Sequence, residues 1–349
     1  MNPPATPGLL ILTAQPGSDD LALRELRAAH AEARLVAELA PGILLVSVEA
    51  PFASLADVWR AAPPIFTRHI CPAPISVPLT GTSSDIDALR AALGGLLGHF
   101  SPDQTFSVQT RILAEGAAYR PFDVNTTLAA VLSATGAPLD VRAPAQVLSV
   151  VVARHGETLT GFLGASAAGD NLSDWAGGVR RFARDAEQIS RSEFKLLEAL
   201  DVFRITLAPR STALDLGAAP GGWTRVLRQR GVYVTAVDPA ALDPRLSSDP
   251  GVRFRRMTAQ RYLAGDPDRF DLIVSDMRMD ARDAARLMVA CARLLPPAGP
   301  VITTLKLPEH GQAAPLQEAL GILRAAYTIA GARQLFHNRS EVTAYVRRP

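Results

Sequence analysis

Two lysines stand out in a chain whose positive charge is otherwise carried by arginine. Of its 36 basic residues, 34 are arginines and only Lys195 and Lys306 are lysines. A guanidinium group stays protonated in proteins, whereas a buried ammonium group can lose its proton and act as a base. One interpretation is that these two lysines serve in proton transfer, and the other is that they are ordinary surface residues. Their positions relative to the predicted strands bear on this choice.

A glycine-rich turn is the second chemical feature. The segment LDLGAAPGGWT, residues 214–224, runs from an apolar strand through the turn into a helix. Gly217 allows the chain to turn sharply, while Gly221 and Gly222 leave bare main chain at the helix start for a ligand to approach. The spacing is not the GxGxxG of dinucleotide-binding proteins, which argues against a nicotinamide oxidoreductase. Asp215 near the start of the turn instead suits a cationic aminoacyl group.

Further polar residues stand at the ends of predicted strands. Asp238 ends VYVTAVD, Asp276 ends FDLIVSD, Lys306 ends GPVITTLK, and Glu341 opens the last strand. Ligands of open α/β sheets bind outside the carboxyl ends of the strands, so one of the two lysines lies where a reactive group belongs. A carboxylate at the position of Asp238 can accept both hydroxyls of an adenosyl ribose. The alternatives are ordinary turn capping and a plain salt-bridge cluster.

The elements that must position these residues lie in the second half of the chain. Helices and strands alternate from residue 190 onward, which predicts a parallel, doubly wound sheet of the Rossmann type. The fold class is therefore α/β, with smaller α/β units before the sheet. We predict a ferredoxin-like unit over residues 1–68, a second α/β domain over 69–165, a linker over 166–189 and the Rossmann-like domain over 190–349.

Further strands and helices are predicted in both halves of the chain. VLSVVVARHGETLTGFLG, residues 147–164, predicts two strands joined by a turn at His155-Gly156. The segments LDVRAP, residues 139–144, and ARQLFH, residues 332–337, also predict strands. Helices are expected over residues 191–203, 281–295 and 315–326.

Composition limits the function classes. Hydrophobic residues make up 48% of the chain and charged residues 20%, which is typical of a globular protein. No apolar run is long enough to cross a bilayer and no basic leader opens the chain, so we expect a cytoplasmic protein without a membrane partner. Cys71 and Cys291 lack metal-ligand spacing, so no metal is expected. Residues 1–178 carry a charge of −6 and residues 179–349 a charge of +8, which favours a polyanion such as RNA at the second half.

These motifs resemble a known family. LDLGAAPGGW, the SDM of residues 275–277, the strand-end lysine and RSEVTAYV resemble the FtsJ-type ribose methyltransferases. SRSEFKLLEAL, LKLP and QLFHNRSEVT are similar to the ribosomal RNA large subunit methyltransferase M family. The resemblance is strong from about residue 171 to the end. Before that it is architectural, and residues 70–165 resemble a THUMP-type RNA-binding domain in strand pattern.

The resemblance implies a cofactor, a substrate and a set of site residues. The cofactor is S-adenosylmethionine, and the substrate is a cytidine ribose of 23S ribosomal RNA or a precursor. The family's Lys-Asp-Lys-Glu tetrad is matched by Lys195, Asp276, Lys306 and Glu341. We predict Lys306 as the general base, with its pKa lowered by Lys195. The predicted cofactor-binding residues are Ser192, Asp215, Gly217, Ala219, Pro220, Gly221, Gly222, Trp223, Asp238 and Asp276.

Several assignments stay open at this point. Ser192 could equally cap its helix, Trp223 could equally pack in the core, and His337 is expected to be structural or to face RNA. Thr258 stands where the family usually has an acidic residue near the adenine amino group. The alternative functions are an FtsJ-like methyltransferase for another RNA, and an RNA-binding or ribosome-assembly factor with a decayed cofactor pocket.

Overall fold

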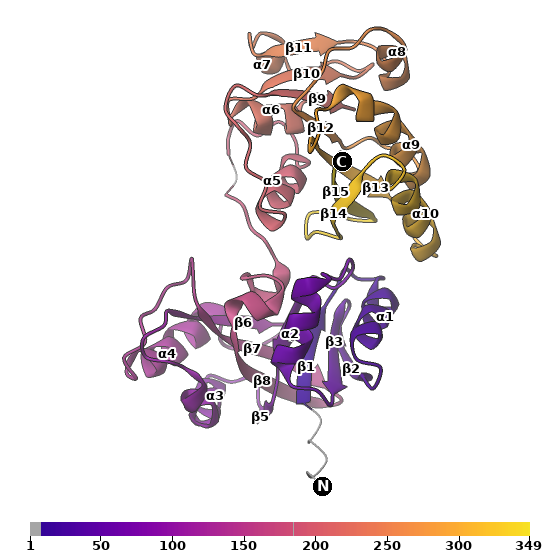
Figure 1. Ribbon diagram of the computed structural model, residues 1–349. Helices are drawn as coiled ribbons and strands as arrows, with labels where there is room; N and C mark the ends of the chain where they lie inside the picture. The colour runs from indigo at the N-terminus through magenta and orange to yellow at the C-terminus, as the bar shows by residue number, and fades with distance from the viewer. Residues whose placement is uncertain (1–7, 184) are drawn as a thin grey trace. The chain divides into compact units, whose positions relative to one another are not determined.

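The chain folds into two compact units (Figure 1), which we describe separately. The computed structural model describes residues 8–183 and 185–349. One unit ends at Val179 and the other begins at Arg180, a boundary that lies inside the segment predicted as the linker. The start of that segment forms two short 3-10 helices in the first unit, η2 (Ala168–Asn171) and η3 (Ala176–Gly178). The other predicted domain boundaries stay a prediction.

The first unit begins with a four-stranded antiparallel sheet in the order β2-β3-β1-β4. Its elements are β1 (Gly8–Thr13), α1 (Asp19–Ala29), β2 (Arg34–Ala40), β3 (Ile43–Val48), α2 (Phe52–Ala61) and β4 (His69–Pro72). The turn between β2 and β3 needs Gly42, because its φ is +77° and a Cβ there would lie 2.6 Å from the carbonyl oxygen of Ala14.

A second four-stranded sheet completes this unit, in the order β5-β8-β7-β6, with β6 and β7 parallel. Its elements are β5 (Ile75–Leu79), α3 (Asp85–Leu93), η1 (Gly94–His99), β6 (Phe106–Ile112), α4 (Pro121–Ser133), β7 (Gln146–His155) and β8 (Thr158–Ala167). The turn predicted between β7 and β8 is confirmed. The strand predicted over residues 139–144 is wrong. Asp140 accepts hydrogen bonds from the main-chain nitrogens of Arg142 and Ala143 at 2.8 and 3.1 Å, which closes a turn instead.

The two sheets of the first unit share a core. Apolar residues from both sheets form one buried cluster, which includes Ile11, Leu45, Cys71, Val151 and Phe162. Both cysteines of the chain are buried and free. Among residues 8–183 and 185–349, no group of three His, Cys, Asp or Glu residues could hold a metal ion, and none of the helices is long and apolar enough to cross a membrane.

The second unit is built on a seven-stranded sheet in the order β11-β10-β9-β12-β13-β15-β14. The strands are β9 (Thr212–Leu216), β10 (Tyr233–Val237), β11 (Val252–Arg255), β12 (Leu272–Ser275), β13 (Pro300–Lys306), β14 (Thr328–Arg333) and β15 (Glu341–Arg347). The strands from β11 to β13 run parallel, and β15 is antiparallel to both of its neighbours. The order reverses at β9. Following the chain from β9, strands are added first on the side that ends with β11 and then on the side that ends with β14. The predicted α/β fold is confirmed.

Helices cover both faces of this sheet. They are α5 (Glu193–Val202), α6 (Gly222–Arg228), α7 (Pro244–Ser247), α8 (Ala259–Ala264), α9 (Ala281–Cys291), η4 (Ala292–Leu294) and α10 (Ala313–Leu323). Helix α5 contacts α6, and α9 contacts both α8 and α10. Figure 1 shows these two groups on opposite faces of the strands. The sequence analysis missed the short helices α7 and α8, which are capped by Asp243 and Thr258.

The strand predicted over residues 332–337 is misplaced. Strand β14 ends at Arg333, and the residues after it form a turn in which the main-chain nitrogen of Leu335 donates to Asn338 at 2.8 Å. The main-chain nitrogens of Phe336 and His337 donate to the buried carboxylate of Glu198 on α5, at 2.8 and 2.9 Å. These hydrogen bonds replace the ladder bonds that a strand would need.

Candidate active site

Four elements of the second unit position the predicted tetrad. Asp276 directly follows β12, and Lys306 is the last residue of the neighbouring strand β13. The antiparallel register of β13 and β15 places Lys306 opposite Glu341. Lys195 lies in the first turn of α5. The carboxyl ends of two parallel strands, the start of an antiparallel strand and one helix therefore supply the four side chains.

Each lysine of the tetrad contacts both carboxylates. The Nζ atom of Lys195 lies 3.1 Å from Oδ2 of Asp276 and 2.5 Å from Oε1 of Glu341. The Nζ atom of Lys306 lies 2.6 Å from Oδ1 of Asp276 and 3.2 Å from Oε2 of Glu341. The hydroxyl of Thr304 also donates to Oδ1 of Asp276, at 2.7 Å. The structure thus brings all four predicted residues together in a closed ring of charges.

Electrostatics hold Lys195 and Asp276 in their charged forms. Burial by itself would lower the pKa of Lys195, but Asp276 and Glu341 outweigh it and the pKa is raised. Burial would likewise raise the pKa of Asp276, but Lys306 and Lys195 outweigh it and the pKa is lowered. Lys195 is therefore held as a cation. Lys306 is the more exposed lysine, at 22% against 17% of its side chain, which makes it the better candidate to meet a substrate.

The glycines of the turn pack closely against neighbouring residues, which leaves no room for a side chain. Gly217 has a φ of +76°, and a Cβ there would lie 2.5 Å from Cγ of Met277. A Cβ at Gly222 would lie 2.2 Å from the hydroxyl oxygen of Ser190 and 2.7 Å from that of Ser192. Gly221 precedes α6 with a φ of +120°, a conformation that side chains disfavour. The turn is therefore fixed beside Met277, the residue next to Asp276.

Asp238 ties the glycine turn to the end of β10. Its Oδ2 accepts from the main-chain nitrogen of Ala219 at 3.1 Å, and its Oδ1 from that of Ala240 at 2.8 Å. Ala219 and Pro220 are joined by a cis peptide bond. A carboxylate oxygen has two lone pairs, so both oxygens of Asp238 can accept a further hydrogen bond. The half-buried carboxylate thus suits the hydroxyls of an adenosyl ribose as well as a turn cap.

Asp215 is enclosed by the protein. It is only 1% exposed, and its Oδ2 accepts a hydrogen bond from the hydroxyl of Thr224 at 2.6 Å. Burial raises its pKa to about 7, to which the negative charges of Asp276 and Asp238 add, while the Thr224 hydrogen bond opposes the rise. The side chain of Asp215 is therefore buried, and Thr224 is its hydrogen-bond partner.

Trp223 and Ser192 are linked to each other. The indole nitrogen of Trp223 donates to the carbonyl oxygen of Ser192 at 2.8 Å, and its ring lies in the core cluster of the sheet. This supports the core-packing interpretation of Trp223. The hydroxyl of Ser192 lies 2.6 Å from that of Ser190 and makes no capping bond to α5. Ser190 and Thr304 were not predicted as site residues, although Thr304 lies two residues before Lys306 and so on the same face of the strand.

Two other residues considered in the sequence have structural partners. The hydroxyl of Thr258 accepts from the main-chain nitrogen of Arg261 at 3.2 Å and caps α8. The ring of His337 packs against Phe182, Phe194 and Phe336, and its Nε2 lies 3.1 Å from a main-chain oxygen. The structural interpretation of His337 is therefore the better supported one.

Known proteins resemble this chain mainly in its second half. The model of the FtsJ-like methyltransferase family matches residues 188–296. The ribosomal RNA large subunit methyltransferase M of Halorhodospira halophila is 39% identical over 181 residues, which are 50% of this chain and 51% of that one. The enzyme of the same name from Laribacter hongkongensis is 36% identical over 187 residues, or 50% and 52% of the two chains. The chain thus spans about half the length of the curated relatives it matches.

Among solved structures, TrmN from Thermus thermophilus aligns with 98% of this chain and 100% of its own, at 20% identity and a TM-score of 0.40. The FtsJ-like match supports S-adenosylmethionine as the cofactor. Residues 188–296 thus match the FtsJ-like methyltransferase family, and about half of the chain is similar to the ribosomal RNA large subunit methyltransferases M.

Proposed function

We propose that this protein methylates a ribose 2′-hydroxyl of RNA, with S-adenosylmethionine as the methyl donor. The observation that carries the proposal is the tetrad, in which the only two lysines of the chain meet Asp276 and Glu341 beside the glycine turn. The relatives are named as ribosomal RNA methyltransferases, which supports an RNA substrate. The charge of +8 on residues 179–349 favours binding of a polyanion to this half.

The residues around the turn fit the cofactor by their chemistry. S-adenosylmethionine supplies a methyl group already activated by its sulfonium charge. Asp238 would accept the ribose hydroxyls, and Asp276 would attract the positive charges of the methionine end. The main chain of residues 217–222 and the hydroxyl of Ser192 would complete the site. Asp215, which is enclosed, would act through its hydrogen bond to Thr224 of α6 and not by contacting the cofactor.

The tetrad supplies what the hydroxyl nucleophile lacks, which is a base and a fixed position. Lys306 would accept the proton of the 2′-hydroxyl. Only a neutral amine can accept a proton, and the pKa of a free lysine is about 10.4, so Lys306 must release its own proton before it takes that of the hydroxyl. Lys195 is held protonated beside it by Asp276 and Glu341. These two carboxylates also hold both lysine side chains in place.

The names of the relatives support ribosomal RNA as the substrate class, and the finer target is our proposal for the whole protein. We propose a cytidine of 23S ribosomal RNA or of its precursor, which places the protein with ribosomal RNA in the cytoplasm. The THUMP-like and ferredoxin-like architecture expected of the first unit would serve to select the RNA. Mass mapping of 2′-O-methyl groups in ribosomal RNA from cells with and without the gene tests this directly. Loss of one cytidine modification supports it, and an unchanged map contradicts it.

The general base is tested by Lys306→Arg, which keeps the charge but not the ability to lose a proton. We expect methylation to fall by at least about a hundredfold, the lower end of what general-base catalysis contributes. Binding of S-adenosylmethionine, measured by isothermal titration calorimetry, should stay close to that of the wild type. Arg286→Lys is the matched control, since among the described residues Arg286 pairs with the exposed Asp283 alone. A rate for Lys306→Arg near that of the control would refute the assignment.

One observation favours a second candidate, an RNA-binding or assembly factor with a decayed cofactor pocket. Thr258 has no carboxylate to offer adenine, and its hydroxyl is already used in capping α8. Titration with S-adenosylmethionine separates the two candidates, because an assembly factor with a decayed pocket would show no binding at millimolar cofactor. Another RNA as substrate for the same chemistry would instead leave cofactor binding intact and the 23S map unchanged.

A further inference from the structure

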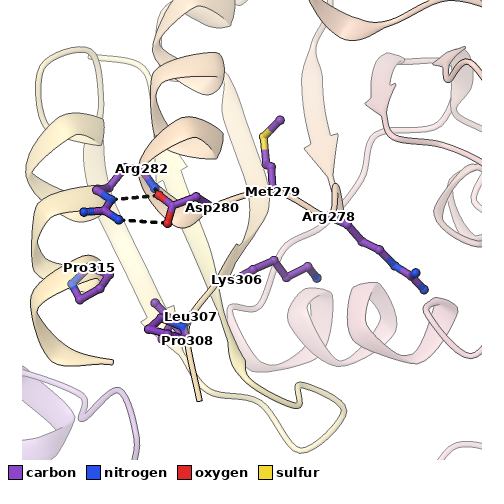
Figure 2. A pocket seen from close by; sticks show the side chains of 8 residues that line it. All are labelled: Arg278, Met279, Asp280, Arg282, Lys306, Leu307, Pro308 and Pro315. Atoms are coloured by element: carbon purple, nitrogen blue, oxygen red, sulfur yellow. Dashed lines mark hydrogen bonds and ion pairs between the residues drawn. The ribbon is translucent and has the colours of Figure 1, made fainter. Parts of the chain in front are cut away.

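A pocket opens beside Lys306 in the second unit, and the tetrad does not account for it. Its volume is about 480 Å³, within the roughly 300–1,000 Å³ that is common for ligand pockets. Lys306 and Arg278 line it together with apolar surface from Met279, Leu307, Pro308 and Pro315. The pocket therefore combines an apolar wall with Lys306, the residue that we propose as the base (Figure 2).

The positive charges around this pocket differ in whether they are already paired. Arg282 is held by Asp280, at 3.0 and 3.2 Å, and by Glu318 at 3.2 Å. Lys306 is held by the two carboxylates of the tetrad. Arg278 is exposed and, within the part of the chain that the structure describes, makes no hydrogen bond or ion pair. It is thus the cation of the pocket that remains available to a ligand.

The position of Arg278 is set by the strand that also positions the tetrad. It lies two residues after Asp276, in the segment between β12 and α9. In Figure 2 its side chain and that of Lys306 extend to the same side, away from Arg282. A planar guanidinium group binds a phosphate through two parallel hydrogen bonds. In RNA, the 2′-hydroxyl and the 3′-phosphate are attached to adjacent carbons of one ribose, so a phosphate must lie close to any base that contacts that hydroxyl.

We infer that this pocket is the subsite for the nucleotide on the 3′ side of the target ribose. Arg278 binds the 3′-phosphate of the target, and the apolar wall receives the sugar and base that follow. The inference rests on the proposed function, because it takes the 2′-hydroxyl to lie at Lys306. It adds a positioning residue that lies outside the tetrad and the glycine turn.

The test compares Arg278→Gln with Arg286→Gln in the full-length protein. Both residues are exposed arginines of the same unit, but Arg286 is paired with Asp283. The probe is an in vitro transcript of 23S ribosomal RNA, and binding is measured by fluorescence anisotropy at several salt concentrations. For Arg278→Gln we expect binding about tenfold weaker and a salt slope smaller by about 1, because one phosphate contact is lost. Arg286→Gln should match the wild type.

Methylation kinetics give a second readout. A phosphate contact made equally before and during the reaction contributes uniform binding, so Arg278→Gln should raise KM about tenfold and leave kcat nearly unchanged. Arg278→Lys keeps a point charge but loses the bidentate geometry, and should give an intermediate KM with the full salt slope.

The outcomes separate this inference from the proposed function. If the wild type methylates RNA and Arg278→Gln matches Arg286→Gln in KM and in salt slope, the subsite is refuted while the function stands. If the wild type binds RNA with an Arg278-dependent salt slope but transfers no methyl group, the function is refuted while the phosphate contact stands.

Discussion

Each unit buries a group of ionisable side chains, and the two groups differ in how their charges are balanced. In the second unit, two lysines and two carboxylates form the closed ring of the tetrad. In the first unit, Arg111 lies near His69 and Cys71, which are both buried. Among the described residues, no carboxylate pairs with Arg111, whose Nη1 donates to the hydroxyl of Thr13 at 2.9 Å.

Burial shifts the pKa values of the first group toward neutral forms. Burial, assisted by the charge of Arg111, lowers the pKa of His69 to about 3, and neither ring nitrogen forms a hydrogen bond with any residue that the structure describes. Burial raises the pKa of Cys71 to about 11. Burial also lowers the pKa of Arg111 itself. The histidine and the cysteine are therefore neutral at physiological pH and act as packing groups.

In the tetrad the same burial is overcome by opposite charges. Lys195 has a raised pKa and Asp276 a lowered one, although burial favours the reverse for each. Opposite charges within hydrogen-bond distance thus hold Lys195 and Asp276 in their charged forms, whereas burial without such a partner favours the neutral forms of His69 and Cys71. This difference is why we place the chemistry of the protein at the tetrad. The predictions below test it.

The largest effect is expected from Asp276→Asn. The change leaves two ammonium groups with the single carboxylate of Glu341, and breaking a buried ion pair costs roughly 3–5 kcal/mol of the free energy of unfolding. Urea unfolding at pH 7 measures this loss. Asp283→Asn removes a carboxylate from an exposed pair and should change the free energy by less than about 1 kcal/mol. Equal costs for the two variants would show that the tetrad charges do not depend on each other.

Asp215 resembles the first group, since it is a buried acid without a cation. Because its folded pKa of about 7 exceeds its unfolded value, the folded state binds more protons between pH 4 and 7, and the stability it contributes falls as pH rises through that window. From pH 5 to pH 7 the loss is about 2 kcal/mol. In Asp215→Asn this loss should disappear from urea unfolding measured at the two pH values. An unchanged difference between pH 5 and pH 7 would contradict the raised pKa.

His69 should show a dependence of the opposite sign. Its folded pKa of about 3 lies below its unfolded value near 6.5, so the unfolded state binds more protons between these values and stability falls on acidification. From pH 7 to pH 5 the loss is about 2 kcal/mol. His69→Leu should remove that loss, as followed by unfolding of the full chain at both pH values. The prediction fails if the variant loses as much stability on acidification as the wild type.

The smallest effect is expected from Thr304→Val, which removes one hydrogen bond from the tetrad and keeps all four charges. Asp276 retains both lysines, so the cost should be about 1 kcal/mol, the usual net value of a hydrogen bond. Urea unfolding and methylation rates measure it. A cost as large as that of Asp276→Asn would mean that the hydroxyl of Thr304, and not the ammonium groups, offsets the burial of the Asp276 carboxylate.

Much of the second unit follows from local sequence pattern. The regular alternation of apolar strands and helices predicts the parallel sheet, and the sheet order then brings the ends of β12 and β13 together. Where a side chain binds the main chain in place of strand pairing, the apolar pattern predicts the wrong element. Asp140 closes a turn where the pattern predicts a strand. Glu198, which is 138 residues away from Phe336 in the sequence, accepts a hydrogen bond from the main-chain nitrogen of Phe336.

The sequence by itself determined the fold class of the second unit, the strand-end positions of Asp276 and Lys306, and the scarcity of lysine that drew attention to them. Only the tertiary structure decided that Lys306 faces Glu341 through an antiparallel register, that Arg278 pairs with none of the described residues, and that Asp215 is enclosed. The physical reason is how far apart in the sequence the interacting residues lie. Periodicity and turn chemistry depend on residues a few positions apart, whereas burial and charge pairing depend on side chains that folding brings together from distant parts of the chain.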